Sequence, residues 1–277
     1  MEYRRLAPDP ALAGIVEHYW VVRAPAPPEE LRAVLIPDGR ATVQLCLGAP
    51  GRRLRVGSGT AETNADVFLP VTAEPYVLAQ TGASHYVGVQ LSPWGAAVLW
   101  PDAGRDPRAI DGLSPGRPAA VALARDPAPV LDRWLRAELA RGVGMGAVPA
   151  LVRDVVGRID ADPGDASVAA LALAAGVAPS TLYRAFVRWV GVSPKVYTSI
   201  RRYDGFASTL LARSHGDTGA MLAAAAGYAD EAHAAREFRR HTGMGAAAFR
   251  RRLDGIAALM FDDVAHDSFK PGPGDRP

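Results

Sequence analysis

The sequence contains a single cysteine, Cys46, among 277 residues. It therefore has no internal disulfide and no cysteine cluster that could hold zinc. Long apolar runs are also absent, since no stretch approaches the roughly 20 residues that a membrane-spanning helix needs. Residues 1–10 include two arginines but no apolar run follows them, as one would in a signal peptide. We expect a cytoplasmic protein.

Cys46 lies in AlaThrValGlnLeuCysLeu (41–47), which alternates like a half-buried strand. We interpret it as a buried structural thiol, with a reactive or redox role as the alternative. The histidines show no metal-ligand spacing, and neither a phosphate-binding loop nor a nucleophile elbow is present. The sequence therefore predicts no metal, no cofactor and no catalytic residue, which argues against an enzyme.

The net charge is only +2, but it is unevenly distributed. Residues 1–163 have 17 Lys and Arg against 18 Asp and Glu, whereas residues 164–254 have 12 against 7 and residues 255–277 have 2 against 4. The basic excess thus lies in one block of about ninety residues. Such a block beside a neutral region suggests a polyanionic partner, although many solvated helical surfaces are basic too.

The first part of the chain is rich in short strand-like runs, and ProAspGly (37–39) is a turn signal between two of them. The runs lie at 19–22, 33–36, 42–47, 54–57, 67–71, 76–80 and 86–91. They predict a small antiparallel sheet or barrel. Helical turns are expected at 11–16, from Pro93 to about Trp100, and over 128–141, where apolar residues recur at helical spacing.

Glycine-rich 142–146 predicts a flexible joint. Beyond it, residues 148–253 predict seven helices and no strand, with stops at glycines such as Gly176, Gly191 and Gly227. Helix starts are indicated by Asp165, Pro179, Ser193 with Pro194, Asp217 and Asp230. We therefore divide the chain into domains 1–141 and 148–254, a linker 142–147 and a disordered tail 255–277. With few contacts expected across the joint, the two domains should fold separately.

Two segments of the second domain, 168–186 and 220–238, repeat one pattern. Each has a helix of small apolar residues, a glycine turn and a second helix with outward polar residues, and the turn glycines are 51 residues apart. Small residues allow the helices to cross closely, and the second helix can present its N-terminal part to a DNA major groove. One such unit is a weak signal, but two within the basic block indicate paired helix-turn-helix units.

Further motifs surround these repeats. They are LeuAlaLeuAlaAlaGlyVal (171–177), the 182–186 core, GlyValSerProLysValTyr (191–197), ArgArgTyr (201–203), AlaAlaGlyTyr (225–228) with His233, Arg236 and Phe238, and GlyMetGlyAlaAlaAlaPheArg (243–250). In this ordered set, residues 150–253 resemble the AraC/XylS family of bacterial transcription regulators. The resemblance implies two three-helix subdomains joined by a long helix at about 194–213. Their recognition helices would enter successive major grooves about 34 Å apart.

The resemblance also assigns roles to individual residues. Base contacts are assigned to Ser180, Tyr183, Arg184, Glu231, Ala232 and Arg236. Phosphate contacts are assigned to Arg188, Lys195, Arg201, Arg202, Arg239, Arg240 and Arg250. Core positions are assigned to Leu182, Phe186, Trp189, Leu222 and Phe238. For the charged residues the alternative is a solvated helix face, and Arg236 could instead pair with Glu237 or Asp230.

The sequence departs from the family pattern at several positions. Ala178 stands where a serine usually caps the first recognition helix, and a lost cap costs about 1 kcal/mol. Ala234 replaces an aromatic residue, and Gly245 with Ala246 replaces a Thr/Ser-Pro pair. In the second recognition helix, Ala232 and Ala235 carry no hydrogen-bonding group. We therefore expect the first unit to specify sequence and the second to add backbone and thymine-methyl contacts.

The front domain has motifs of its own, IleValGluHisTyrTrpValVal (15–22), LeuIleProAspGly (35–39) and ValGlyValGlnLeuSerProTrpGlyAlaAla (87–97). These resemble the N-terminal region that precedes such a DNA-binding domain in a group of bacterial regulators. The resemblance implies a β-rich, cupin-like sensor or oligomerisation domain with a helical return, and hence an α+β two-domain chain. Candidate residues for an effector pocket are Trp20, Tyr76, Trp94 and Trp100, with packing in a β core as the alternative.

The sequence thus predicts an effector-responsive transcription regulator, either activator or repressor, that binds double-stranded promoter DNA. A small-molecule effector, RNA polymerase and a second copy of the chain are further candidate partners. One alternative is a protein-interaction module that has lost DNA binding, which the alanines of the second recognition helix favour. The other is an enzyme of DNA-alkylation repair, but Cys46 lacks the ProCysHisArg-like surroundings that this chemistry requires.

Overall fold

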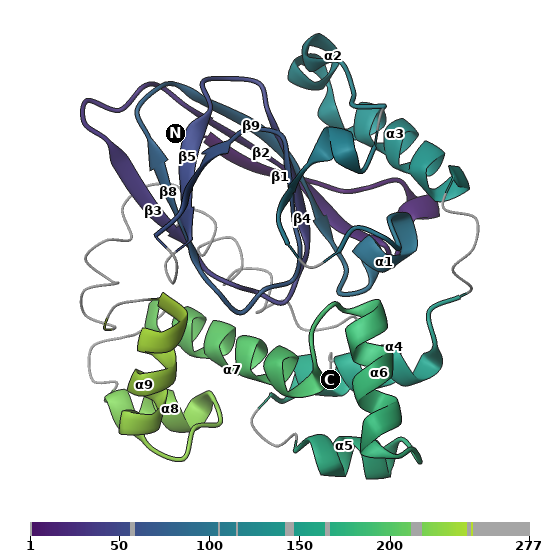
Figure 1. Ribbon diagram of the computed structural model, residues 1–277. Helices are drawn as coiled ribbons and strands as arrows, with labels where there is room; N and C mark the ends of the chain where they lie inside the picture. Colours follow the sequence, from purple (N-terminus) through teal and green to yellow (C-terminus); the bar gives the residue numbers. More distant parts are fainter. Residues whose placement is uncertain are drawn as a thin grey trace, which may run out of the picture.

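The computed structural model describes residues 2–55, 59–104, 106–114, 116–141, 147–163, 167–211, 218–242 and 245. In these residues a β-rich N-terminal domain is followed by a helical C-terminal domain, as the sequence predicted (Figure 1). The joint at 142–146, the helix starts expected at Asp165 and Asp217, the seventh helix and the tail lie outside the described residues.

The N-terminal domain contains two antiparallel sheets. In sheet order, the larger consists of β1 (Glu2–Leu6), β2 (Val16–Ala24), β9 (Ser84–Leu91), β4 (Thr42–Cys46), β7 (Val67–Leu69) and β10 (Arg108–Ala109). The smaller consists of β3 (Leu31–Leu35), β8 (Tyr76–Gln80), β5 (Gly51–Arg55) and β6 (Ala61–Asn64). Each of the seven strand-like runs of the sequence overlaps one of these strands, and residues 56–57 of the run at 54–57 lie outside the described residues. The short or charged strands β1, β6 and β10 were not predicted, because they lack a long apolar alternation.

The turn at 37–39 connects the two sheets. It carries the chain from β3 in the smaller sheet to β4 in the larger one, and these two strands are not neighbours. Gly39 has φ +81°, a conformation that favours glycine. A Cβ on Gly39 would also lie 2.9 Å from Cε2 of Tyr197, which belongs to the helical domain. The same glycine therefore permits the turn and its close contact with the second domain.

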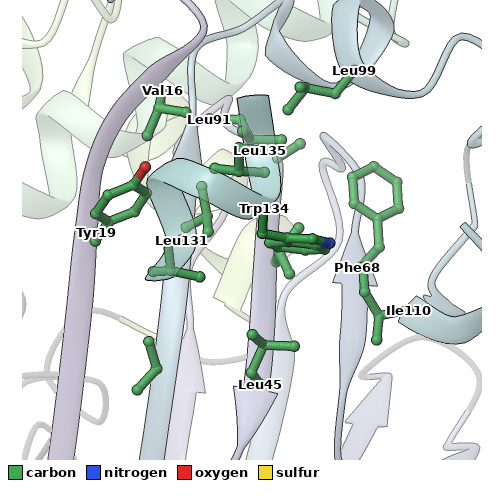
Figure 2. Close-up of a cluster of buried hydrophobic side chains, with 14 of the residues drawn as sticks. Val16, Tyr19, Leu45, Phe68, Leu91, Leu99, Ile110, Leu131, Trp134 and Leu135 are labelled. Atoms are coloured by element: carbon green, nitrogen blue, oxygen red, sulfur yellow. The ribbon is translucent and has the colours of Figure 1, made fainter. Parts of the chain in front are cut away.

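Helices cover one face of the larger sheet. They are η1 (Pro10–Leu12), α1 (Gly95–Leu99), η2 (Ile110–Gly112), α2 (Ala120–Arg125) and α3 (Pro127–Arg141). Figure 2 shows Leu131, Trp134 and Leu135 of α3 packed beside sheet residues such as Leu45 and Leu91. The helical periodicity predicted over 128–141 is confirmed, because its apolar face is the face buried on the sheet.

The C-terminal domain contains the two predicted helical units. Its described helices are α4 (Ala150–Ala161), α5 (Val168–Ala174), α6 (Pro179–Trp189), α7 (Pro194–Leu211), α8 (Gly219–Ala225) and α9 (Glu231–Thr242). The long helix α7 runs beneath the β domain and joins the units (Figure 1). Among the described helices none is by itself long and apolar enough to span a membrane, and only α5 and α6 taken together, bent by 98°, pass a test of length and composition.

Each unit is built around an aromatic core. Phe186 packs against Tyr197 in the first unit, and Phe238 packs against Tyr203 and Phe206 in the second. The core assignment is confirmed for all five residues, Leu182, Phe186, Trp189, Leu222 and Phe238, which are buried. Ala234, at the position where the family has an aromatic residue, is fully buried as well.

Local signals set the helix boundaries. Pro179 occupies the first turn of α6, Oδ1 of Asp230 accepts the backbone N–H of His233 at 2.6 Å, and Gly176, Gly191 and Gly227 have positive φ. Described residues that cap α5 and α8 are Ser167 and Thr218, which accept the backbone N–H groups of Ala170 and Met221. Each of these caps joins residues three positions apart. The sequence analysis indicated Asp165 and Asp217 as the start signals of these two helices and did not name Ser167 or Thr218.

Helix α6 lacks such a cap, because Ala178 makes no side-chain hydrogen bond at its start. We expect Ala178→Ser to raise the free energy of unfolding by about 1 kcal/mol, since a serine hydroxyl can accept a free N–H of the first turn. The matched variant Ser167→Ala removes the existing cap of α5 and should cost a similar amount. Urea unfolding of both variants checks this, and an unchanged Ala178→Ser midpoint would count against it.

Candidate functional site

The start of α6 exposes the residues expected to read bases in the first unit. Ser180, Tyr183 and Arg184 are all exposed, and Tyr183 shows 52% of its surface although it is a large aromatic residue. They lie on one face because residues three or four apart in a helix are neighbours. Leu182 and Phe186 occupy the opposite, buried face. The far end of the helix, at Trp189, packs toward the β domain, so this polar start points away from it.

Helix α9 presents a comparable face with fewer polar groups. Ala232 and Arg236 are exposed, and so are Arg239 and Arg240 one turn further on. Glu231 is exposed too, but its carboxylate lies against the first residue of α8, since a Cβ on Gly219 would be 2.2 Å from Oε1 of Glu231. The described part of this face therefore offers mainly alanines and arginines.

The residues expected to bind phosphate occupy different environments. Arg188 and Lys195 are exposed, and Arg188 lines a hollow between the end of α6 and Trp100. Arg202 is half-buried, with Nη2 donating to the carbonyl of Pro163 at 3.2 Å and its guanidinium over the ring of Tyr228. Arg250 lies outside the described residues.

Arg201 differs from that expectation, because it points into the interface between the two domains. Its Nε donates to Asp160 at 2.9 Å, and its Nη1 donates to the carbonyl of Asp38 at 2.9 Å and to Asp204 at 2.6 Å. A helical pattern shows that Arg201 lies on α7 but not what packs against that face. In this arrangement the guanidinium binds carboxylates of the protein, so we withdraw its assignment to phosphate.

Arg40 reaches the same interface from the β domain. Its Nε donates to Glu17 at 2.5 Å, Nη1 to the hydroxyl of Tyr197 at 2.6 Å, and Nη2 to Asp160 at 2.9 Å. We call the set Glu17, Asp38, Arg40, Asp160, Tyr197, Arg201 and Asp204 the interdomain network. Sequence analysis missed it, although Asp38 belongs to the quoted motif LeuIleProAspGly (35–39) and Arg40 directly follows that motif.

Apolar contacts support the network. Ile200 of α7 is fully buried in the same cluster as the outer face of the larger sheet, and Trp94 and Val98 pack against the core of the first helical unit. The expectation of few contacts between the domains is therefore wrong. Separate folding units and the boundary at 142–147 stay predictions.

The interdomain network contains four carboxylates but only two guanidinium groups. Burial therefore raises the pKa of Glu17 and Asp38 above their ordinary values, against the opposing effect of Arg40. Burial also raises the pKa of Asp204 to about 6, although Arg201 acts to lower it. Burial thus shifts the equilibrium of Glu17, Asp38 and Asp204 toward the protonated form relative to free carboxyl groups.

This gives a pH prediction for Asp204. Its pKa is about 6 in the folded protein against an ordinary value of 3.8, so the folded state binds more protons between these values. The contribution of Asp204 to stability is therefore fully present below about pH 3.8 and is lost as the pH rises through about 6. Asp204→Asn removes the titration, and we expect the difference in unfolding free energy between variant and parent to change across this window. A constant difference from pH 4 to 7 would contradict the prediction.

A cavity of about 140 Å³ lies between the two sheets, on the face of the larger sheet opposite its helices. Trp20 and Tyr76, two of the four aromatic residues expected at an effector pocket, line it. Trp20 lies directly over Gly88, where a Cβ would come within 2.0 Å of its ring. Asp38 and Arg40 also line the cavity, so it borders the interdomain network.

The other two aromatic residues lie elsewhere. Trp94 donates from Nε1 to the carbonyl of Gly14 at 2.7 Å and packs toward the helical domain. Trp100 is buried on the other face of the sheet, where it donates to Glu138 at 2.9 Å. Neither residue lines this cavity, and a sequence pattern does not determine on which side of the sheet an aromatic residue packs.

Cys46 is half-buried on β4, which confirms the strand but not full burial. Burial raises the pKa of its thiol. A raised pKa disfavours the nucleophilic thiolate, which is consistent with a structural role.

Comparisons with known proteins agree with the division into a β-rich N-terminal domain and a helical C-terminal domain. Residues 171–252 match the model described as Helix-turn-helix domain, of AraC type, and residues 4–103 match a Domain of unknown function, DUF6597. No curated protein matches the chain.

Two solved structures of ToxT share the two-domain fold. ToxT from Vibrio cholerae O395 is similar with a TM-score of 0.52 and 8% identity, over 85% of this chain and 97% of that one. A second crystal form of ToxT from Vibrio cholerae gives 0.51 and 7%, over 92% and 100%. The C-terminal domain of the response regulator AraT from Geobacillus stearothermophilus is 20% identical over 38% of this chain and 88% of its own, with a TM-score of 0.35.

Proposed function

Because the chain carries an AraC-type helix-turn-helix domain behind a DUF6597 domain, we propose that it regulates transcription by binding promoter DNA through both helical units. The observation that supports this most directly is the matched exposure of two second helices, α6 and α9, each held by a buried aromatic core. In a helix-turn-helix unit this helix enters the major groove.

The two helical units would make different kinds of contact with DNA. Arg184 can donate two hydrogen bonds to a guanine edge, and Ser180 and Tyr183 lie beside it. Helix α9 offers Arg236, Arg239 and Arg240 along a face of alanines, which suits phosphate contacts and contacts with thymine methyl groups. Further positive charge for the phosphate backbone of DNA would come from Arg188, Lys195 and Arg202.

We further propose that a small molecule in the β-domain cavity controls DNA binding. Asp38 and Arg40 carry this proposal, because both line the cavity and both contact the helical domain. A ligand that moves the Arg40 side chain would change its hydrogen bonds to Asp160 and Tyr197, and one that shifts the backbone at Asp38 would change the bond that its carbonyl accepts from Arg201. Either change would bias how the domains pack. Such a regulator would act in the cytoplasm, where it meets the promoter.

Selection of bound fragments from genomic DNA by the purified chain tests DNA recognition. We expect a consensus with one strong half-site for the first unit and a weaker one about one helical turn away. Affinity for the selected site should fall steeply with salt, since neutralised phosphates release counterions. Recovery of random fragments would refute sequence-specific binding, and a salt-independent affinity would favour an interaction module instead.

A further inference from the structure

Arg202 lies in the middle of α7, the helix that joins the two helical units (Figure 1). Its Nη2 donates to the carbonyl of Pro163, in the loop between α4 and α5 of the first unit, at 3.2 Å. Its guanidinium also lies over the ring of Tyr228, 5.6 Å from the ring centroid, in the turn between α8 and α9 of the second unit. One side chain therefore contacts a loop of each unit.

Tyr228 extends this contact to the start of α9. Its ring is buried and packs at 83° against Phe206 of α7, with the centroids 5.7 Å apart. On the same ring, His233 in the first turn of α9 packs at 82°, with the centroids 5.3 Å apart. Edge-to-face contacts of this kind fix how two rings are oriented. A shift of Arg202 would therefore reach the end of α9 that is proposed to face DNA.

Two faces of α7 contact different neighbours. Ser199, Arg202 and Phe206 follow one another at spacings of three and four residues, so they share the face toward the second unit. On this face the hydroxyl of Ser199 also donates to Glu237 of α9 at 3.1 Å. Arg201, one residue before Arg202, binds the β domain instead. The interdomain network and the contact between the two units thus meet at consecutive residues of one helix.

Helix α7 is weakened directly after Arg202. Gly205 lies inside the helix, where glycine is less favourable than any residue except proline. The hydroxyl of Thr209 donates to the carbonyl of Gly205 at 2.7 Å, a local bond that often bends helices. A bend at this point would move the second unit relative to the first. Arg202 resists it, because Pro163 belongs to the unit before the bend and Tyr228 to the unit after it.

Arg202 is also less available to DNA than the exposed Arg188 and Lys195, since it is half-buried and its Nε is buried. Its charge can attract the DNA backbone, but its guanidinium is already held within the protein. We propose that Arg202 is a positioning residue that fixes the angle between the two helical units, and with it the half-site spacing that the protein accepts. The proposal rests on the proposed binding of DNA through both units and names a residue that sets its geometry.

A distance measurement without DNA tests the first part. Leu173→Cys and Met221→Cys, in a full-length chain with Cys46→Ala, place spin labels on α5 and α8 at side chains that are 83% and 58% exposed. Double electron–electron resonance then gives the distribution of distances between the units. We expect Arg202→Leu and Arg202→Lys each to broaden it about twofold, because lysine keeps the charge but not the planar guanidinium. Arg188→Leu, which removes an exposed arginine of α6, is the matched control and should leave it unchanged.

Titration against DNA duplexes tests the second part. One base pair inserted between the selected half-sites moves the second by about 3.4 Å and turns it by about a tenth of a turn. We expect the parent to lose about tenfold in affinity, as for a mismatched base pair, and both Arg202 variants to lose about twofold or less. Gly205→Ala should restore part of the parent ratio in Arg202→Leu, because a Cβ there meets no atom within 4 Å and alanine favours the helix.

Each outcome decides between separate claims. An unchanged distance distribution in both Arg202 variants would overturn the positioning role, and a broadened distribution with an unchanged spacing ratio would overturn the control of spacing. A salt slope that falls by about one in Arg202→Leu and returns in Arg202→Lys would overturn both, because it would assign Arg202 to a phosphate contact. Arg202→Lys decides the test by itself if Arg202→Leu does not fold. A parent that binds all sequences alike would refute the proposed function, while the distance distribution would still decide the role of Arg202.

Discussion

Arg40→Leu lowers the free energy of unfolding of the full-length chain by about 3–5 kcal/mol, the range expected when one partner of a buried ion pair is removed. The Arg40 side chain is only 13% exposed, and its loss leaves Glu17 and Asp160 without that guanidinium. Chemical denaturation measures the effect. Arg32→Leu is the matched control, because Arg32 pairs with Glu30 on the surface and its loss should cost less than about 1 kcal/mol.

The same variant, Arg40→Leu, should also weaken the contact between the two domains. We expect faster limited proteolysis in 142–146. We also expect a changed affinity for DNA without a changed sequence preference, because the Arg40 guanidinium bonds Glu17, Tyr197 and Asp160, which lie outside α6 and α9. If Arg40→Leu is no less stable than Arg32→Leu, the network does not hold the domains together. If the folded variant binds DNA as the parent does, the cavity is not coupled to the helical units through Arg40.

Arg184→Ala weakens binding to the preferred DNA site by about 1–3 kcal/mol and relaxes the choice of base at one position. The reason is that Arg184 is exposed one turn into α6, whose start is set by Pro179, so its guanidinium can reach a guanine edge. Titration against matched and mismatched duplexes at two salt concentrations measures both effects.

Arg239→Ala and Arg240→Ala serve as the comparison. They should weaken binding to matched and mismatched duplexes alike and lower the salt slope by about one unit, as the loss of a phosphate contact does. An equal loss for both duplexes in Arg184→Ala would mean that Arg184 contacts phosphate. The assignment of sequence preference to the first unit would then be withdrawn.

The sequence by itself determined the local structure of this protein. Helix boundaries followed from Pro179, Asp230 and the turn glycines, since caps act within one turn. Strand runs followed from periodicity, which records which side of an element is buried. The buried positions Leu182 and Phe186 followed from the resemblance of the second domain to a known family. The repeat of Gly176 and Gly227 revealed two related units, because each unit needs its own turn.

Only the tertiary structure decided what faces those elements. The turn at Gly39 joins two different sheets, Arg201 binds Asp160 and Asp204 instead of facing outward, and Trp94 and Trp100 lie away from the cavity that holds Trp20. Arg40 and Asp160 are 120 residues apart in the chain, yet they share a hydrogen bond. The physical reason is that periodicity and capping act within a few residues, whereas a cavity or a charge network depends on which distant surfaces pack together.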